Sequence, residues 1–193
     1  MKNNRHGQAA ILSNNDYSKI RKYLKSKKYK LLIDIAWFTG ERIGALIRLK
    51  VSDCYDENLK PRETITFQAN TRKASPDGSK KTRQLHIHST LKESLKAYKP
   101  AGDSEFLFHN RSGENHITPR WADKILRSAL DAAELTAKGI SWHSFRRTFI
   151  TRLHRKGTDL YTIRRITGHK DLKSLERYVE IDVDQIKGAI EAL

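Results

Sequence analysis

The spacing of apolar residues predicts three helices at the start of the chain. Ser13 stands three residues before Asp16, a capping-box pattern that opens a helix. The segment KLLIDIAWFTG is mostly apolar and ends at Gly40, a common helix terminator. In ERIGALIRLK, apolar residues recur at helical spacing on one face. The predicted helices cover residues 13–27, 30–40 and 41–50, the last burying Ile43, Leu46 and Ile47.

The pattern then changes to a period of two, which predicts strands. Ile65 and Phe67 alternate with polar residues in ETITFQA, and RQLHIHS (83–89) repeats the alternation. The sequence Pro-Asp-Gly at 76–78 is a turn signal between them. We therefore expect a small antiparallel hairpin with a strongly basic tip. RLKVSDCY (48–55) is a candidate third strand.

Helical periodicity returns after the hairpin. Thr118 followed by Pro119 is typical of a helix start. Further helices are predicted over 91–98, 118–135, 143–156, 159–168 and 171–181, with a loop at 104–113. The tail, 183–193, forms a last helix with an apolar stripe at Val183, Ile186, Ile190 and Leu193. The expected fold is α+β and mostly α-helical, with a small antiparallel sheet, in one domain over 1–193.

Composition limits the class of protein. Hydrophobic residues make up 37% of the 193 residues, enough for a core. No apolar run approaches the ~20 residues of a membrane span, and the polar N-terminus lacks a signal peptide's apolar centre. A single cysteine, Cys54, excludes an internal disulfide and a four-cysteine zinc site. We expect a cytoplasmic protein that is not bound to a membrane.

The net charge indicates the partner. Lys and Arg total 38 against 22 Asp and Glu, which gives +16 and a pI near 10.0. Basic residues occur in nearly every segment, so the charge is not confined to a tail. Such a surface attracts polyanions, and nucleic acid is the expected partner. Charge alone also fits ribosomal or membrane-surface proteins, and it carries no sequence specificity.

Four short motifs follow one another along the chain. TGER places Arg42 directly after a buried helix, HSFRRTF places His143 and Arg146 on one helix face, and TGHK contains His169. Tyr178 follows nine residues after His169. Taken alone, each has an ordinary explanation: a surface arginine, a solvated basic face, a capping histidine, a half-buried packing tyrosine. Their combination and order are far more specific than any one of them.

Together these motifs resemble the tyrosine recombinase (phage-type integrase) family, whose catalytic domain they match over about residues 13–182. The family's first box, TG-x-R, matches TGER. Its H-x-[LF]-R-[HR]-[TS]-F-x-T box matches HSFRRTFIT, and its GH-x4-[TS]-x3-Y box matches the stretch from Gly168 through Ser174 to Tyr178. The resemblance implies that fold and a site-specific DNA recombinase that works without metal, other cofactor or ATP.

The resemblance also implies a role for each matched residue. Tyr178 would attack phosphorus and form a 3′-phosphotyrosine. Arg42 and Arg146 would hold the phosphate with their forked donors, and His169 would donate a further hydrogen bond to it. His143 would orient the site or help to move the tyrosine proton. The candidate general acid on the leaving 5′ oxygen is Lys73, with Lys80 and Lys81 on the opposite hairpin arm as alternatives. Further candidate DNA contacts are Arg72, Lys80, Lys81, Arg83, Arg147 and Lys170.

Several positions depart from the family pattern. An acidic residue often stands three residues after the first arginine, where this chain has Ala45, so we expect backbone groups to hold Arg42 instead. Arg147 stands where histidine is common, Thr167 replaces an apolar residue before Gly-His, and Glu180 follows the tyrosine where histidine or a small polar residue is usual.

Length is the largest departure. Family members usually carry an N-terminal helical domain that closes a clamp around DNA, whereas 12 residues precede Ser13 here. The start, MKNNRHGQAA, favours a naturally minimal recombinase, similar in size to small bacterial promoter invertases, over a shortened form of a longer protein. Such a protein would bind isolated sites weakly and act as a tetramer on paired sites. The helix at 183–193 would either dock on a neighbouring protomer or pack on its own domain.

Several functions remain open at this point. Integration, inversion and resolution differ in site arrangement more than in protein chemistry, and a DNA-bending accessory protein is a further candidate partner. A type IB topoisomerase uses a similar constellation, but its chain is usually much longer. A non-catalytic DNA-binding regulator has no need for all five of Arg42, His143, Arg146, His169 and Tyr178. A basic RNA-binding or ribosomal protein leaves the ordered motifs unexplained.

Overall fold

The computed structural model describes residues 9–71, 81–100, 102, 104–169, 171–176, 178, 190 and 191. The chain divides into two compact units, residues 1–149 and 150–193, and each unit is described by itself. The first unit holds nearly all of the described hydrophobic core. Within the described residues, no helix has the length and apolar character needed to cross a membrane.

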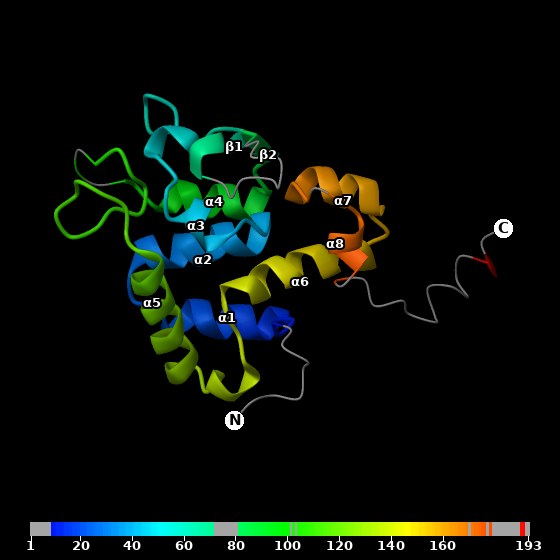
Figure 1. The fold of residues 1–193 in the computed structure, drawn as a ribbon. Coiled ribbons are helices and arrows are strands. Elements are labelled where there is room, and N and C mark those ends of the chain that lie inside the picture. Colours follow the sequence, from blue (N-terminus) through cyan, green and yellow to red (C-terminus); the bar gives the residue numbers. More distant parts are fainter. Residues whose placement is uncertain are drawn as a thin grey trace. The chain divides into compact units, whose positions relative to one another are not determined.

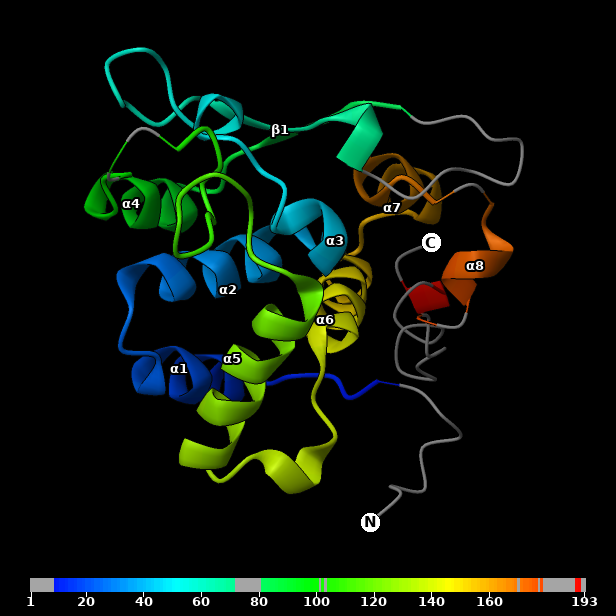
Figure 2. The same ribbon diagram turned by 60° about the vertical axis from the view of Figure 1, so that its left-hand side comes forward.

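The first unit is built around a buried helix, α2 (Figure 1). This helix packs against α1, α3 and α4, and α5 packs against α1 and α3 (Figures 1 and 2). Its apolar residues are buried on most sides, as its composition predicts, and it ends at Gly40 in the left-handed conformation. The helices are α1 (Asn14–Tyr23), α2 (Lys27–Thr39), α3 (Ile43–Leu46), α4 (Ser89–Ala97), α5 (Pro119–Ala132) and α6 (Trp142–Arg155), with 3₁₀ turns η1 (Val51–Asp53), η2 (Ala69–Thr71) and η3 (Thr136–Lys138).

The predicted capping box is present at the start of α1. The Asp16 backbone N–H donates to Ser13 Oγ at 3.1 Å, and the Ser13 backbone N–H donates to Asp16 Oδ2 at 3.0 Å. The helix ends at Tyr23, earlier than predicted, because Leu24 turns into extended backbone and buries its side chain. The predicted helix at 41–50 is likewise shorter and is reduced to the single turn of α3.

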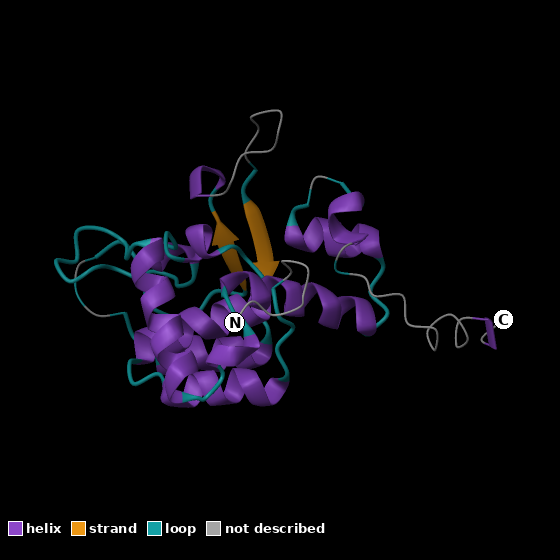
Figure 3. Ribbon diagram, turned by 60° about the horizontal axis from the view of Figure 1, so that its bottom comes forward, coloured by secondary structure: helices purple, strands orange, loops and turns teal. Residues whose placement is uncertain are grey.

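The predicted hairpin is present, with β1 (Thr64–Phe67) antiparallel to β2 (Arg83–His86) (Figure 3). The two strands form a two-stranded sheet in the described part of the chain. The prediction of a third strand at 48–55 is wrong. There Asp53 Oδ2 accepts the Lys50 backbone N–H at 2.9 Å, which closes the segment into the turn η1. The predicted loop at 104–113 is confirmed.

The second unit has its own small core. It begins within α6 and continues through α7 (Leu160–Thr167) and α8 (Lys173–Glu176). Ile150, Ile163 and Leu175 are fully buried, and the partly buried side chain of Tyr178 packs against them. The helix predicted over 171–181 is described only as α8, and nearly all of the predicted tail helix lies outside the described residues.

Candidate active site

A cavity of about 540 Å³ in the first unit brings together three of the predicted site residues. Arg42, His143 and Arg146 all line it, although 101 residues separate the first two in the sequence. The cavity is also lined by Glu41, Ile43, Gly44, Ala45, Arg48, Asn70, Thr71 and Trp142. Two guanidinium groups and an imidazole on one concave surface suit a phosphate group.

Gly40 shows why the first motif needs its glycine. Its φ of +58° is in the left-handed region, and a Cβ there would lie 2.5 Å from Cδ1 of Phe149 in the second motif. The Gly40 carbonyl also accepts a hydrogen bond from Arg146 Nη1 at 2.9 Å. The turn at Gly40 therefore connects the motif that contains Arg42 to the motif that contains Arg146.

Arg42 enters the cavity from the first residues of α3. It is the N-cap of this helix, its backbone N–H donates to Glu41 Oε1 at 2.8 Å, and its side chain is half-buried. Its guanidinium forms no hydrogen bond with any residue that the structure describes. Among the described residues, no backbone group holds this guanidinium, and Arg42 lines the cavity.

Arg146 and His143 lie one turn apart on α6 but differ in environment. Arg146 is 3% exposed. Its Nη1 donates a hydrogen bond to the Gly40 carbonyl and lies 3.8 Å from Glu41 Oε1. His143 is exposed at the edge of the cavity. A buried arginine that contacts Gly40 and Glu41 suits phosphate binding, and an exposed histidine suits proton transfer.

The remaining residues of the second motif are structural in this arrangement. Thr148 is fully buried, and its Oγ1 accepts the Leu12 backbone N–H at 2.8 Å. Arg147 Nη1 donates to the Ala9 carbonyl at 2.7 Å. These contacts tie the N-terminal segment to α6. The role of Arg147 as a DNA contact stays a prediction.

The other two predicted residues lie together in the second unit. The ring centroids of His169 and Tyr178 are 5.9 Å apart. The Tyr178 backbone N–H donates to the Leu175 carbonyl at 2.8 Å, and the Tyr178 carbonyl accepts a hydrogen bond from the Thr151 hydroxyl at 3.4 Å. The tyrosine is therefore half-buried and anchored through its backbone, with its ring beside the histidine.

Thr167 fixes the tautomer of His169. The Thr167 hydroxyl donates its one proton to the Ile163 carbonyl at 2.7 Å. Its 2.6 Å contact with His169 Nδ1 therefore requires a proton on Nδ1, an assignment made from the hydrogen-bond network. As a result, His169 Nε2 carries a proton only when the ring is an imidazolium.

The predicted lysine and three of the six predicted DNA contacts lie outside the described part of the chain. Lys73, Arg72, Lys80 and Lys170 lie outside the described residues. The cavity of about 540 Å³ lined by Arg42, His143 and Arg146 is called the Arg42 cavity below. Thr71 also lines it, and Thr71 is the last described residue before Arg72 and Lys73. Lys81 is exposed.

Arg83 has a different environment from that expected of a DNA contact. Its side chain is 6% exposed, and its Nη2 donates to Glu41 Oε2 at 2.5 Å. Its guanidinium carbon lies 5.1 Å from the centre of the Phe67 ring. The structure thus gives this arginine an internal ion pair, and its DNA contact stays a prediction.

Sequence reasoning missed Glu41, the most buried acidic residue in the cavity wall, with 2% of its surface exposed. Two features of the sequence pointed to it. Glu41 is a charged residue between two apolar helical segments, and this chain has Ala45 where the family pattern often has an acidic residue. Asn70, Thr71 and Trp142 also line the cavity without having been predicted.

Three other potential nucleophiles, Cys54, Tyr17 and Tyr55, are kept protonated by their surroundings. Burial raises the pKa of the Cys54 thiol, which keeps it protonated. Burial, with the nearby Asp34 carboxylate, raises the pKa of Tyr17, whose hydroxyl donates to Asp34 Oδ1 at 2.7 Å. Burial also raises the pKa of Tyr55. Tyr178 differs from these two tyrosines because its ring lies beside a histidine.

The sequence matches the profile of the phage integrase family over residues 10–185. The chain belongs to this family. It is 30% identical over 172 residues to the tyrosine recombinase XerC of Oceanobacillus iheyensis, an alignment covering 81% of this chain and 54% of that protein. The XerC of Anoxybacillus flavithermus is 30% identical over 170 residues, covering 80% and 55%. The chain thus spans about half the length of these relatives.

Solved structures show the same fold at lower sequence identity. The XerA recombinase superposes with a TM-score of 0.74 at 19% identity, covering 96% of this chain and 65% of that one. The catalytic domain of bacteriophage HP1 integrase has a TM-score of 0.65 at 18% identity, covering 95% of both chains. XerH bound to its difH substrate has a TM-score of 0.68 at 23% identity, covering 94% and 53%. The predicted mostly helical fold with a small antiparallel sheet is confirmed.

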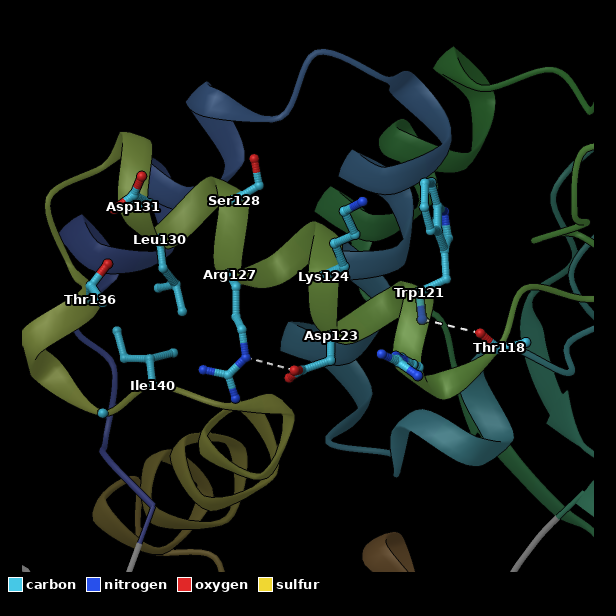
Figure 4. A pocket seen from close by; sticks show the side chains of 12 residues that line it. Thr118, Trp121, Asp123, Lys124, Arg127, Ser128, Leu130, Asp131, Thr136 and Ile140 are labelled. Atoms are coloured by element: carbon cyan, nitrogen blue, oxygen red, sulfur yellow. Dashed lines mark hydrogen bonds and ion pairs between the residues drawn. The ribbon is translucent and has the colours of Figure 1, made fainter. Parts of the chain in front are cut away.

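This phage integrase family member has a second cavity, of about 860 Å³, beside α5 and η3 (Figure 4). Trp121 is exposed there with Lys124 Nζ 5.2 Å from its ring centre, and Arg127 Nε pairs with Asp123 at 2.6 Å. Arg120 also lines it. The lining also contains Asp131, so three basic side chains stand beside two acidic ones and an exposed tryptophan. In the described part of the chain, no three His, Cys, Asp or Glu side chains are grouped as metal ligands.

Proposed function

We propose that this chain is a site-specific DNA recombinase that cuts and rejoins strands through a covalent link to Tyr178. The observation that carries the proposal is the cavity lined by Arg42, His143 and Arg146, because it supplies paired guanidinium groups for a phosphate. Family membership and the His169–Tyr178 pair support it.

In the proposed reaction, the Tyr178 oxygen attacks a DNA phosphorus atom and a new P–O bond forms. The bond from phosphorus to the 5′ oxygen breaks, leaving a 3′-phosphotyrosine and a free 5′ hydroxyl. Arg42 and Arg146 stabilise charge on the non-bridging oxygens, and His169 donates to them as an imidazolium. The tyrosine proton passes to His143 or to solvent.

The leaving 5′ oxygen takes its proton from Lys73. The position of Thr71 in the cavity wall supports this assignment, because Lys73 follows it by two residues. Lys80 and Lys81 are the alternatives. Religation reverses the steps with a second strand's 5′ hydroxyl, and no ATP is needed because the phosphotyrosine keeps the energy of the broken bond.

The partner is double-stranded DNA, and the active form is a tetramer on two paired sites. The net charge of +16 supports DNA binding. The outcome of the reaction, integration, inversion or resolution, depends on how the sites are arranged. We propose that the chain acts as one catalytic domain over residues 1–193.

A covalent-trapping assay tests this function. The protein is incubated in EDTA with nicked duplexes made from the DNA that flanks its gene, and the products are separated on a denaturing gel. A shifted protein–DNA band is expected for the wild type and for Tyr161→Phe, which removes a 65% exposed tyrosine of the second unit. The band should disappear in Tyr178→Phe. DNA binding without any band would instead favour the non-catalytic regulator.

A further inference from the structure

Glu41 is a carboxylate in the wall of the Arg42 cavity that is almost completely removed from water. Its side chain is 1% exposed. Oε2 accepts Arg83 Nη2 at 2.5 Å, while Oε1 accepts the Arg42 backbone N–H at 2.8 Å and lies 3.8 Å from Arg146 Nη1. One carboxylate thus touches both arginine motifs and the hairpin.

These contacts join three segments that are distant in sequence. Arg83 lies on β2, the strand that follows the hairpin segment containing Lys73. Arg146 lies on α6, and Glu41 itself lies in the turn between α2 and α3. Because Glu41 contacts both Arg83 and Arg146, its position affects the phosphate-binding arginine and the strand that follows the candidate general acid in sequence.

The charges explain why a carboxylate is needed there. Arg83 and Arg146 are buried, with side chains 6% and 3% exposed, and two buried guanidinium groups without a counter-charge would repel each other. Glu41 supplies a negative charge to both guanidinium groups, and Arg146 still lines the cavity that suits a phosphate.

The family pattern that the sequence resembles often has an acid three residues after the first arginine, where this chain has Ala45. Ala45 is buried and lines the same cavity as Glu41. We propose that Glu41 takes the place of the missing acid and acts as a positioning residue: its carboxylate holds Arg146 in the orientation that strand cleavage requires and anchors β2 through Arg83. The inference rests on the proposed recombinase function.

The test separates cleavage from DNA binding. Single-turnover formation of the covalent complex on a nicked duplex is compared with equilibrium affinity for the same DNA. For Glu41→Gln we expect cleavage to slow by about tenfold to a hundredfold, as is usual when a supporting residue is lost, with affinity changed less than about threefold. Glu63→Gln, which breaks an exposed ion pair with Lys92, should leave both unchanged.

Two further variants guard against a folding defect. Glu41→Asp keeps the charge but draws the carboxylate back by one methylene, so positioning predicts slow cleavage by a protein that circular dichroism shows to be folded. Glu41→Leu combined with Ala45→Glu should recover part of the rate that Glu41→Leu alone loses. Wild-type cleavage by folded Glu41→Gln or Glu41→Asp would overturn the inference but leave the proposed function intact. Absence of cleavage by the wild type itself would instead count against the function.

Discussion

Single residues connect the motifs of this chain. Gly40 ends α2, leaves no room for a Cβ beside Phe149, and accepts a hydrogen bond from Arg146 at its carbonyl. Thr167 in the third motif has a comparable role toward His169. In both cases a small residue sets the geometry of a neighbouring functional side chain.

Replacing Gly40 with alanine should therefore cost more than backbone strain alone. The left-handed conformation costs an alanine about 1–2 kcal/mol, and the clash with Phe149 adds about 1–3 kcal/mol. Gly113→Ala is the matched control, because Gly113 has φ +83° with nothing within 4 Å of the added Cβ. Urea unfolding measures both, and equal losses in the two variants would rule out the contact with Phe149 as a constraint.

Thr167→Val should change how cleavage depends on pH. In the wild type, His169 Nε2 can donate only as the imidazolium, so cleavage should decline as rising pH removes that proton. The variant frees Nδ1, so the neutral tautomer with a proton on Nε2 becomes available and the alkaline decline becomes shallower. The rate at its maximum should fall by about tenfold, since the ring loses its support.

The measurement for Thr167 is the single-turnover cleavage rate across a pH series. Thr162→Val provides the control on the same helix, because Thr162 is exposed and contacts Asp159 through its backbone and its side chain, not the ring of His169. A pH profile of identical shape in Thr167→Val and the wild type would show that Thr167 does not set the tautomer.

Among the elements, α1 depends on a capping group that responds to pH. Burial raises the pKa of Asp16, but hydrogen bonds from Lys138 and Ser13 outweigh this effect, so the pKa of Asp16 lies below its ordinary value. A lowered folded-state pKa means stabilisation that is present above the ordinary pKa and is lost as pH falls through the folded value.

Asp16→Asn should consequently reduce the free energy of unfolding by about 1 kcal/mol near neutral pH, and by much less once the carboxyl of the wild type is protonated. The control, Asp123→Asn, removes an exposed pair with Arg127 that should contribute well under about 1 kcal/mol. Urea unfolding at neutral and acidic pH measures both variants. A deficit in Asp16→Asn that stays constant with pH would contradict the assignment.

Structure that depends on residues close together in sequence was predictable from the sequence. Structure that depends on hydrogen bonds between residues far apart in sequence was not. The capping box and the Gly40 terminator act over three or four residues, so the sequence alone indicates them. Glu41 bonds Arg83 across 42 positions, and the Gly40 carbonyl bonds Arg146 across 106, which no local pattern encodes. The predicted third strand failed because the Asp53 side chain competes for a backbone N–H.

The C-terminal segment, residues 183–193, is proposed to join protomers when the protein assembles on DNA. The stripe of Val183, Ile186, Ile190 and Leu193 is proposed to dock on a neighbouring protomer, although nearly all of this segment lies outside the described residues. Deleting residues 183–193 should then reduce formation of the paired-site complex about tenfold or more, with single-site binding nearly unchanged. Equal losses of both, in native gels with one-site and two-site DNA, would favour packing on its own domain.

Mapping the adduct would show whether Tyr178 becomes covalently bonded to a DNA 3′ phosphate. The trapped complex would be digested with nuclease and protease, and the peptide carrying the nucleotide identified by mass spectrometry. We predict a nucleotide attached through its 3′ phosphate to the peptide that contains Tyr178. A nucleotide on a peptide from elsewhere in the chain, or a linkage to a 5′ phosphate, would contradict the account.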